Sequence, residues 1–251
     1  MQGELRIIGL PGIPEVLPSA DLPALLMAAA QAQVGGFENG DVLVVTQKVV
    51  SKAESRLVDL TTVTPSPFAE ELARNWNKDP RLVELVLRES RRTVRMDQGV
   101  IITETKHGFV CANSGIDQSN VPGDTVVSLL PEDPDASARG IRDAIKQRTG
   151  ADVGVIVSDT FGRPWRMGNT DIALGVAGIS PLLSYVGQDD PYGYRLRVSV
   201  SAIADELASA AELVMGKVSG VPAALVRGYE FTPSEGSARS LVRSAERDLF
   251  R

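Results

Sequence analysis

The chain has 251 residues, of which 43% are hydrophobic and 23% are charged, and its formal net charge at pH 7 is −6. This composition is ordinary for a globular protein, and the length suits one large domain or two modest ones. The negative charge argues against a nucleic-acid or acidic-lipid partner. One histidine, His107, nearly excludes histidine-rich zinc sites and Ser-His-Asp triads, and one cysteine, Cys111, leaves no internal disulfide.

Targeting signals and common nucleotide motifs are absent from the sequence. The first residues have no basic segment followed by a long apolar one, and no uninterrupted apolar run reaches about 18 residues. We therefore expect a cytoplasmic protein with no membrane span. Neither G-x-x-x-x-G-K-[ST] nor a helix-opening G-x-G-x-x-G occurs, so a nucleotide site here would need another architecture.

The first third of the chain predicts a strand, a helix and a second strand. Residues 5–10 predict a short strand, and the prolines and glycines of residues 9–14 predict a rigid turn. That turn is either a plain entry loop or backbone that approaches a ligand closely. Ser19 or Asp21 can cap a helix that runs to about Gln33.

Three cations follow a predicted buried strand at residues 42–46: Lys48, Lys52 and Arg56. On a helix, Lys48 and Lys52 would share one face, whereas Gln47 and Lys52 could instead lie along a loop. Cations at this place suit an anionic ligand. A solvated charged face explains the pattern at least as well, so both interpretations stay open.

The next segments are expected to have a structural role. Helices are predicted to start at Ser66-Pro67, with Phe68, Leu72 and Trp76 as the buried stripe, and at Asp79-Pro80. The arginine-rich residues 88–95 are expected at the surface. Residues 99–113 predict a hairpin with His107 at its tip and Cys111 buried in its second arm, neither of them catalytic.

Two polar stretches follow predicted strands, and each contains a candidate metal ligand. Residues 113–123 contain Asp117 and Asn120, and the apolar run from residue 153 ends in Ser158, Asp159 and Thr160. A carboxylate and a hydroxyl at a strand end would emerge where α/β proteins place ligands, and both are oxygen donors that Mg²⁺ and Mn²⁺ prefer. Turn formation or helix capping explains the same residues, so a shared metal site remains one of two interpretations.

The remaining elements complete a mixed α/β pattern. We predict a strand at residues 124–130, a helix at residues 133–148, and close backbone packing at residues 175–181. A strand at residues 196–200 precedes a helix capped by Ser201, and on this helix Ile203, Leu207, Ala211 and Val214 fall on one face. A Gly-flanked turn at residues 215–220, an apolar run at 221–227 and a short C-terminal helix follow.

Seven segments, taken in order, carry a resemblance: GLPGIPE, GDVLVVTQKVVSKAESR, ITETKHGFVCANSGIDQSN, LLPEDPDASARGIR, VSDTFGRPWRMGNTDIALGVAG, DPYGYRLRVSVSAIADELASAAELVMGKVSGVP and VRGYEF. The chain resembles the coenzyme F-420:L-glutamate ligases, or coenzyme F-420-0 gamma-glutamyl ligases, in their stand-alone form. The resemblance implies one ligase unit over residues 1–251, with an α/β fold of two subdomains in an intertwined homodimer. It also implies GTP, Mn²⁺ or Mg²⁺, K⁺, L-glutamate and a deazaflavin precursor as cofactors and substrates, with an acyl phosphate as intermediate.

The resemblance also assigns roles to residues. Asp117 and Asp159 match catalytic metal ligands, and Thr160 matches a further metal ligand. Nucleotide contacts are implied at Leu10, Pro11, Gly12, Ile13, Gln47, Lys52, Asn120, Met215, Gly216, Lys217 and Val218. Lys217 stands at a position that can serve a second metal, but a charged lysine cannot be an ordinary ligand.

An acidic chain that binds polyanions must concentrate its cations locally. We expect Lys48, Lys52, Arg163 and Arg166 to do so, with Arg166 and Asn169 facing the substrate. Two other functions remain open: a metal-dependent phosphotransferase or ligase acting on another carboxylate, and a non-catalytic deazaflavin- or nucleotide-binding protein.

Overall fold

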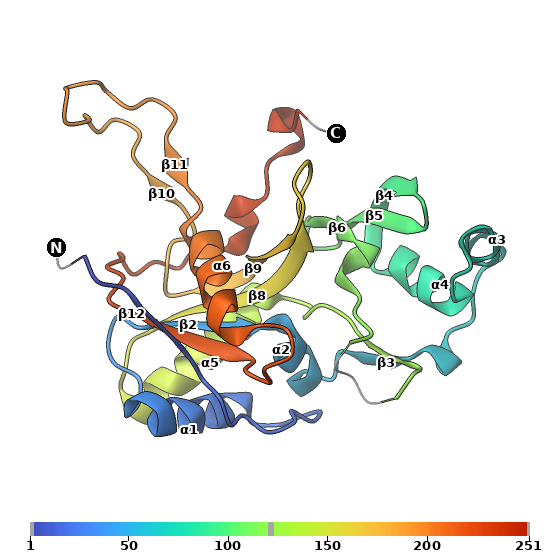
Figure 1. Ribbon diagram of the computed structural model, residues 1–251, viewed down its shortest axis with the longest axis horizontal. Helices are drawn as coiled ribbons and strands as arrows, with labels where there is room; N and C mark the ends of the chain where they lie inside the picture. The colour runs from blue at the N-terminus through green and yellow to red at the C-terminus, as the bar shows by residue number, and fades with distance from the viewer. Residues whose placement is uncertain (1–2, 120–122, 250–251) are drawn as a thin grey trace.

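The computed structural model describes residues 3–119 and 123–249 and shows a mixed α/β protein built on a five-stranded sheet (Figure 1). The sheet order is β1 (Arg6–Gly9), β12 (Ala223–Arg227), β2 (Val42–Thr46), β8 (Gly154–Gly162) and β9 (Asn169–Ala177). Strands β2 and β8 are parallel, and the other neighbours are antiparallel. The predicted strands at residues 5–10 and 42–46 are confirmed, and the apolar run at residues 221–227 forms β12.

Helices cover both faces of this sheet, which explains its continuous apolar strands. Helices α1 (Leu22–Val34) and α5 (Pro134–Thr149) pack on one face, and α6 (Ile203–Met215) packs on the other (Figure 1). Asp21 and Asp133 cap α1 and α5 through side-chain hydrogen bonds, as the sequence predicts for α1. Ser201 does not cap α6, because it lies in β11 (Val200–Ser201) and Ala202 holds the N-cap position.

Strand β8 is longer than predicted, and this moves two candidate ligands. Asp159 and Thr160 lie within the strand, not at its end, because β8 continues to Gly162 and forms a hairpin with β9. Strand β9 was not predicted from the sequence. The predicted close backbone packing is confirmed at Gly175, where an added Cβ would lie 2.1 Å from the carbonyl oxygen of Pro134.

A second region carries a three-stranded antiparallel sheet of β4 (Ser90–Asp97), β5 (Val100–Thr105) and β6 (Val110–Ala112). It packs with α3 (Pro67–Trp76) and α4 (Pro80–Arg88), at the right of Figure 1. The hairpin and both helix starts are confirmed, and the four arginines of residues 88–95 are exposed as expected, three of them on β4. The predicted stripe is wrong at Phe68, which is 54% exposed, because α3 buries Ala69 and Ala73 instead.

Shorter elements connect these regions. Strand β3 (Leu57–Asp59) pairs with β7 (Val126–Ser128), and helix α2 (Gln47–Ala53) follows β2 directly. The predicted strand at 196–200 is reduced to β11, which pairs with β10 (Leu183–Ser184) at the base of a projecting arm (Figure 1). The 3-10 helices are η1 (Leu60–Thr62), η2 (Asn113–Gly115), η3 (Ala238–Leu241) and η4 (Ala245–Arg247). Within the described residues, every helix is too short or too polar to cross a membrane.

Candidate active site

Lys48 and Lys52 lie one turn apart on helix α2. Of the two arrangements predicted for this segment, a helix or a loop, the helix is therefore correct. Lys48 Nζ lies 2.7 Å from Asp117 Oδ2 and donates to Ser119 Oγ at 2.6 Å. Lys52 is 5% exposed, and its Nζ lies 2.6 Å from Glu15 Oε1. A buried ammonium is costly unless it is paired, so Lys52 is not part of a solvated face.

Asp117 is held in place by backbone and side chain together. Its backbone forms an isolated antiparallel bridge with Ser128 in β7, and its Oδ1 accepts a 2.7 Å hydrogen bond from Ser119 N. Burial opposes ionisation of its carboxyl, but the hydrogen bonds from Lys48 and Ser119 outweigh that effect and lower its pKa. Asp117 is therefore a positioned carboxylate.

Asp159 lies among other acids. Burial, assisted by the negative charges of Asp171 and Asp117, raises the pKa of its carboxyl to about 7, against the opposing hydrogen bond from Thr160 N and the charge of Lys48. Asp117, in the segment between η2 and β7, and Asp159, in β8, thus influence each other electrostatically. A cation bound between them would relieve this repulsion.

Asp171 is a site residue that the sequence analysis missed. It is 2% exposed and lies opposite Thr160 in the β8–β9 register. Its Oδ1 accepts from Thr160 Oγ1 at 2.6 Å, and its Oδ2 accepts from Ser158 Oγ at 3.1 Å. A carboxylate directly before the apolar run at residues 172–177 was the available signal, but the strand had to be recognised first.

Asp159 and Asp171 line a cavity of about 330 Å³ between the β2–α2 junction, the β8–β9 hairpin and the turn after α6, whereas Asp117 is not part of its lining. Its polar lining includes Lys48, Lys52, Asp159, Thr160, Asp171 and Lys217. Of the expected nucleotide-contacting residues, those that line the cavity are Ile13, Lys52, Met215, Gly216, Lys217 and Val218.

The other expected nucleotide contacts are not part of that lining. Leu10 is buried, and Pro11 and Gly12 are exposed in the loop that leads to Ile13. Gln47 is 1% exposed, and its Nε2 is a buried donor without a hydrogen-bond partner. Asn120 lies outside the described residues.

The predicted arginines also lie away from the cavity lining. Arg163 donates to the carbonyl oxygens of Met167 and Gly168, which ties the tip of the β8–β9 hairpin together. Arg166 and Asn169 are exposed on the same hairpin. Whether they face a substrate stays a prediction.

The donor set fits one cation better than two. Asp117 and Asp159 offer carboxylate oxygens of the kind that Mg²⁺ and Mn²⁺ bind. The hydroxyl of Thr160 instead donates to Asp171 and accepts from the Lys217 ammonium. Within the described residues, no three His, Cys, Asp or Glu side chains gather at a metal position, so any further ligands would come from hydroxyls, water or substrate.

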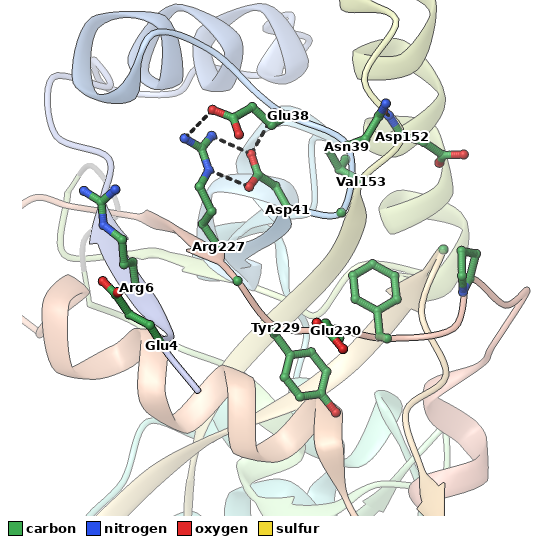
Figure 2. Close-up of a pocket in the computed structure, with 15 residues that line it drawn as sticks. Glu4, Arg6, Glu38, Asn39, Asp41, Asp152, Val153, Arg227, Tyr229 and Glu230 are labelled. Atoms are coloured by element: carbon green, nitrogen blue, oxygen red, sulfur yellow. Dashed lines mark hydrogen bonds and ion pairs between the residues drawn. The ribbon is translucent and has the colours of Figure 1, made fainter. Parts of the chain in front are cut away.

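A larger cavity of about 740 Å³ lies at the opposite end of β12, and its Arg227 is already paired with two acids of the lining (Figure 2). Arg227 lies 2.8 Å from Asp41 Oδ1 and 2.7 Å from Glu38 Oε1. Asp41 is 1% exposed, so this pairing fastens β12 to the loop before β2. The smaller cavity, with its acidic cluster and lysines, is the better candidate for chemistry on anions.

Fold and site together define a mixed α/β protein with a cavity lined by carboxylates and lysines. The family model for F420-0:gamma-glutamyl ligase matches residues 12–228, and the chain belongs to this family. The Coenzyme F420:L-glutamate ligase of Methanothermobacter thermautotrophicus is 43% identical over 98% of this chain and 99% of its own. Proteins with that name from Methanopyrus kandleri (98% of each chain) and Methanocaldococcus jannaschii (86% of each) are 46% and 45% identical.

Proposed function

We propose that this chain is a GTP-dependent ligase that adds L-glutamate to a deazaflavin precursor of coenzyme F420 and then extends a γ-linked glutamate tail. The observation that carries the proposal is the cavity in which Asp159, Thr160 and Asp171 lie beside Lys48, Lys52 and Lys217. The family membership and the names of its relatives support a coenzyme F420 precursor and L-glutamate as substrates.

The proposed reaction has two steps. A carboxylate oxygen of the precursor attacks the γ-phosphorus of GTP, the bond to the β-phosphate oxygen breaks, and GDP leaves. The glutamate amine then attacks the acyl carbon of the resulting acyl phosphate. Phosphate leaves, the nitrogen loses a proton, and an amide remains. Phosphorylation gives the carboxyl group a good leaving group, phosphate. Direct condensation with the amine would have to expel a poor one, hydroxide.

The residues of the cavity have distinct roles in this scheme. Lys48 and Lys52 attract and orient the triphosphate, because their ammonium groups balance its charge. Asp117 and Asp159 would hold Mn²⁺ or Mg²⁺, which supplies charge neutralisation for phosphoryl transfer. Gln47 can supply its buried unpartnered amide donor to a bound ligand after a small rearrangement. We also expect K⁺ to raise turnover.

A mass-spectrometric time course tests the proposal. Purified protein is mixed with the deazaflavin precursor, GTP, Mn²⁺ and L-glutamate, and we expect successive glutamyl mass increments that vanish without GTP or Mn²⁺. Glutamate-independent transfer of phosphate to another carboxylate would favour the phosphotransferase alternative. Binding of GTP or precursor without any turnover would favour the non-catalytic alternative.

We propose a homodimer on separate grounds, from the arm between β10 and β11. Tyr192 and Val198 on this arm are 96% and 87% exposed, and the arm projects away from the sheet (Figure 1). Apolar side chains gathered on a projection favour contact with a second copy of the chain. Light scattering should give twice the mass of one chain, and replacing both side chains by Ser should shift the equilibrium towards monomer.

A further inference from the structure

The turn after α6 places the ammonium group of Lys217 against three oxygen-bearing side chains of the cavity. Its Nζ contacts Thr160 Oγ1 directly, lies 3.5 Å from Asp171 Oδ1 and lies 3.9 Å from Glu212 Oε1. These oxygens come from β8, β9 and α6, so three separate elements converge on one positive charge.

The surroundings hold this ammonium at the cluster. The Asp171 side chain is 3% exposed, and such a carboxylate needs a positive partner in addition to its hydroxyl donors. Gly216 ends α6 with φ 62° and ψ −180°, a conformation open essentially to glycine, and so turns the chain at Lys217. Lys217 nevertheless keeps 56% of its side chain exposed towards solvent, where a ligand could meet it.

Hydroxyl and carboxylate oxygens at this spacing are also the donors that a hard divalent cation uses. An ammonium group and a metal ion cannot occupy the same place. Lys217 lies among the oxygens of Thr160, Asp171 and Glu212, whereas the Lys48 ammonium pairs with one carboxylate oxygen of Asp117 and leaves the other, with Asp159, to a cation. We propose that Lys217 is a built-in cation at the Thr160–Asp171–Glu212 cluster, so that this active site takes one divalent cation, at Asp117 and Asp159, and not a second one at Thr160. The free face of the ammonium meets the anionic nucleotide in place of a second metal.

The use of this charge in phosphoryl transfer rests on the proposed function, but occupancy of the cluster does not. Counting bound Mn²⁺ therefore tests the inference without turnover. Each protein is titrated with Mn²⁺ alone, and bound Mn²⁺ is measured as the loss of the electron paramagnetic resonance signal of free Mn²⁺. Wild type should bind one Mn²⁺ per chain, and Lys217→Glu, which exchanges the ammonium for a ligand, should bind a second.

Three further variants make the count specific. Lys217→Met removes the charge without adding a ligand and should show a second site at least about tenfold weaker than that in Lys217→Glu. Asp117→Asn should remove one Mn²⁺ from wild type and one from Lys217→Glu. Lys78→Glu makes the same charge change outside the cavity lining and should leave the count at one.

Circular dichroism on every variant would confirm an intact fold. Two bound Mn²⁺ in wild type, or none, would overturn the inference, as would a folded Lys217→Glu that still binds one. If the counts follow the expectation and no glutamate is ligated in the time course, the proposed function fails while the built-in cation stands.

Discussion

The central sheet is covered on both faces, whereas the three-stranded sheet packs against helices and leaves much of its surface exposed. Val42, Leu43, Val44 and Val45 of β2 are all 0% exposed. Along β5, by contrast, Val100 is 45% exposed and Ile101 is 1% exposed. Packing on both faces makes the central sheet rigid. The more exposed three-stranded sheet is held less tightly and can move more easily.

The candidate site draws on both regions. Asp159 and Asp171 belong to the rigid sheet, and Asp117 lies in the chain that leads out of the three-stranded sheet towards β7. The ion pair between Lys48 and Asp117 links the two sources. The central sheet thus fixes the acidic cluster, and the second region delivers one carboxylate to it.

The largest effect should come from the acidic cluster itself. Asp159→Asn preserves the shape of the side chain but removes a negative charge, so we expect glutamyl transfer to fall about a thousandfold or more. Steady-state kinetics at saturating Mn²⁺ would measure the loss. Asp143→Asn, at an exposed position on α5, is the matched control and should retain full activity. Unchanged activity in Asp159→Asn would contradict the metal assignment.

Rigidity of the central sheet can be tested at Gly175. A Cβ there would lie 2.1 Å from the carbonyl oxygen of Pro134, so Gly175→Ala must push α5 away from β9. We expect a loss of about 2–4 kcal/mol in the free energy of unfolding. Urea denaturation would measure it.

The control lies in the same helix that Gly175 contacts. Gly140 in α5 has open space around its Cβ position, and Gly140→Ala should stabilise the protein by about 0.5–1 kcal/mol through helix propensity. If Gly175→Ala is as stable as wild type, α5 can move away from β9 at little cost, and the central sheet is not the rigid part of the molecule.

Sequence patterns predicted what depends on neighbours along the chain. The run at residues 42–46, the cap at Asp21 and the helix starts at Ser66 and Asp79 all rest on local propensity, and they are confirmed. Asp171 was missed because its role depends on register with Thr160, a partner across a hairpin. The prediction for Phe68 was wrong because helical spacing shows which residues share a face of α3, but not which face packs against α4.

The link between the regions can be measured at Lys48. Lys48→Met should weaken GTP binding and raise the KM for GTP about tenfold, because Lys48 anchors both the triphosphate and Asp117. A cycle with Asp117→Asn would isolate the coupling in stability, which we expect to be about 1 kcal/mol for a partly exposed pair. Additive effects of the two changes on both stability and KM would show that the regions act independently at the site.

The smallest effect lies within the second region, at the contact between α3 and α4. Hydrogen bonds from the Ser66 hydroxyl and backbone N–H, then from Arg88, lower the pKa of Glu84 from 4.5 to about 2. Because the folded-state pKa is depressed, this stabilisation is present above pH 4.5 and is lost as the pH falls towards 2. Glu84→Gln should therefore cost about 1 kcal/mol at pH 7 and progressively less below pH 4.5. Thermal unfolding of both proteins across this range would measure the difference, and a pH-independent gap would show that shape, not charge, joins the two helices.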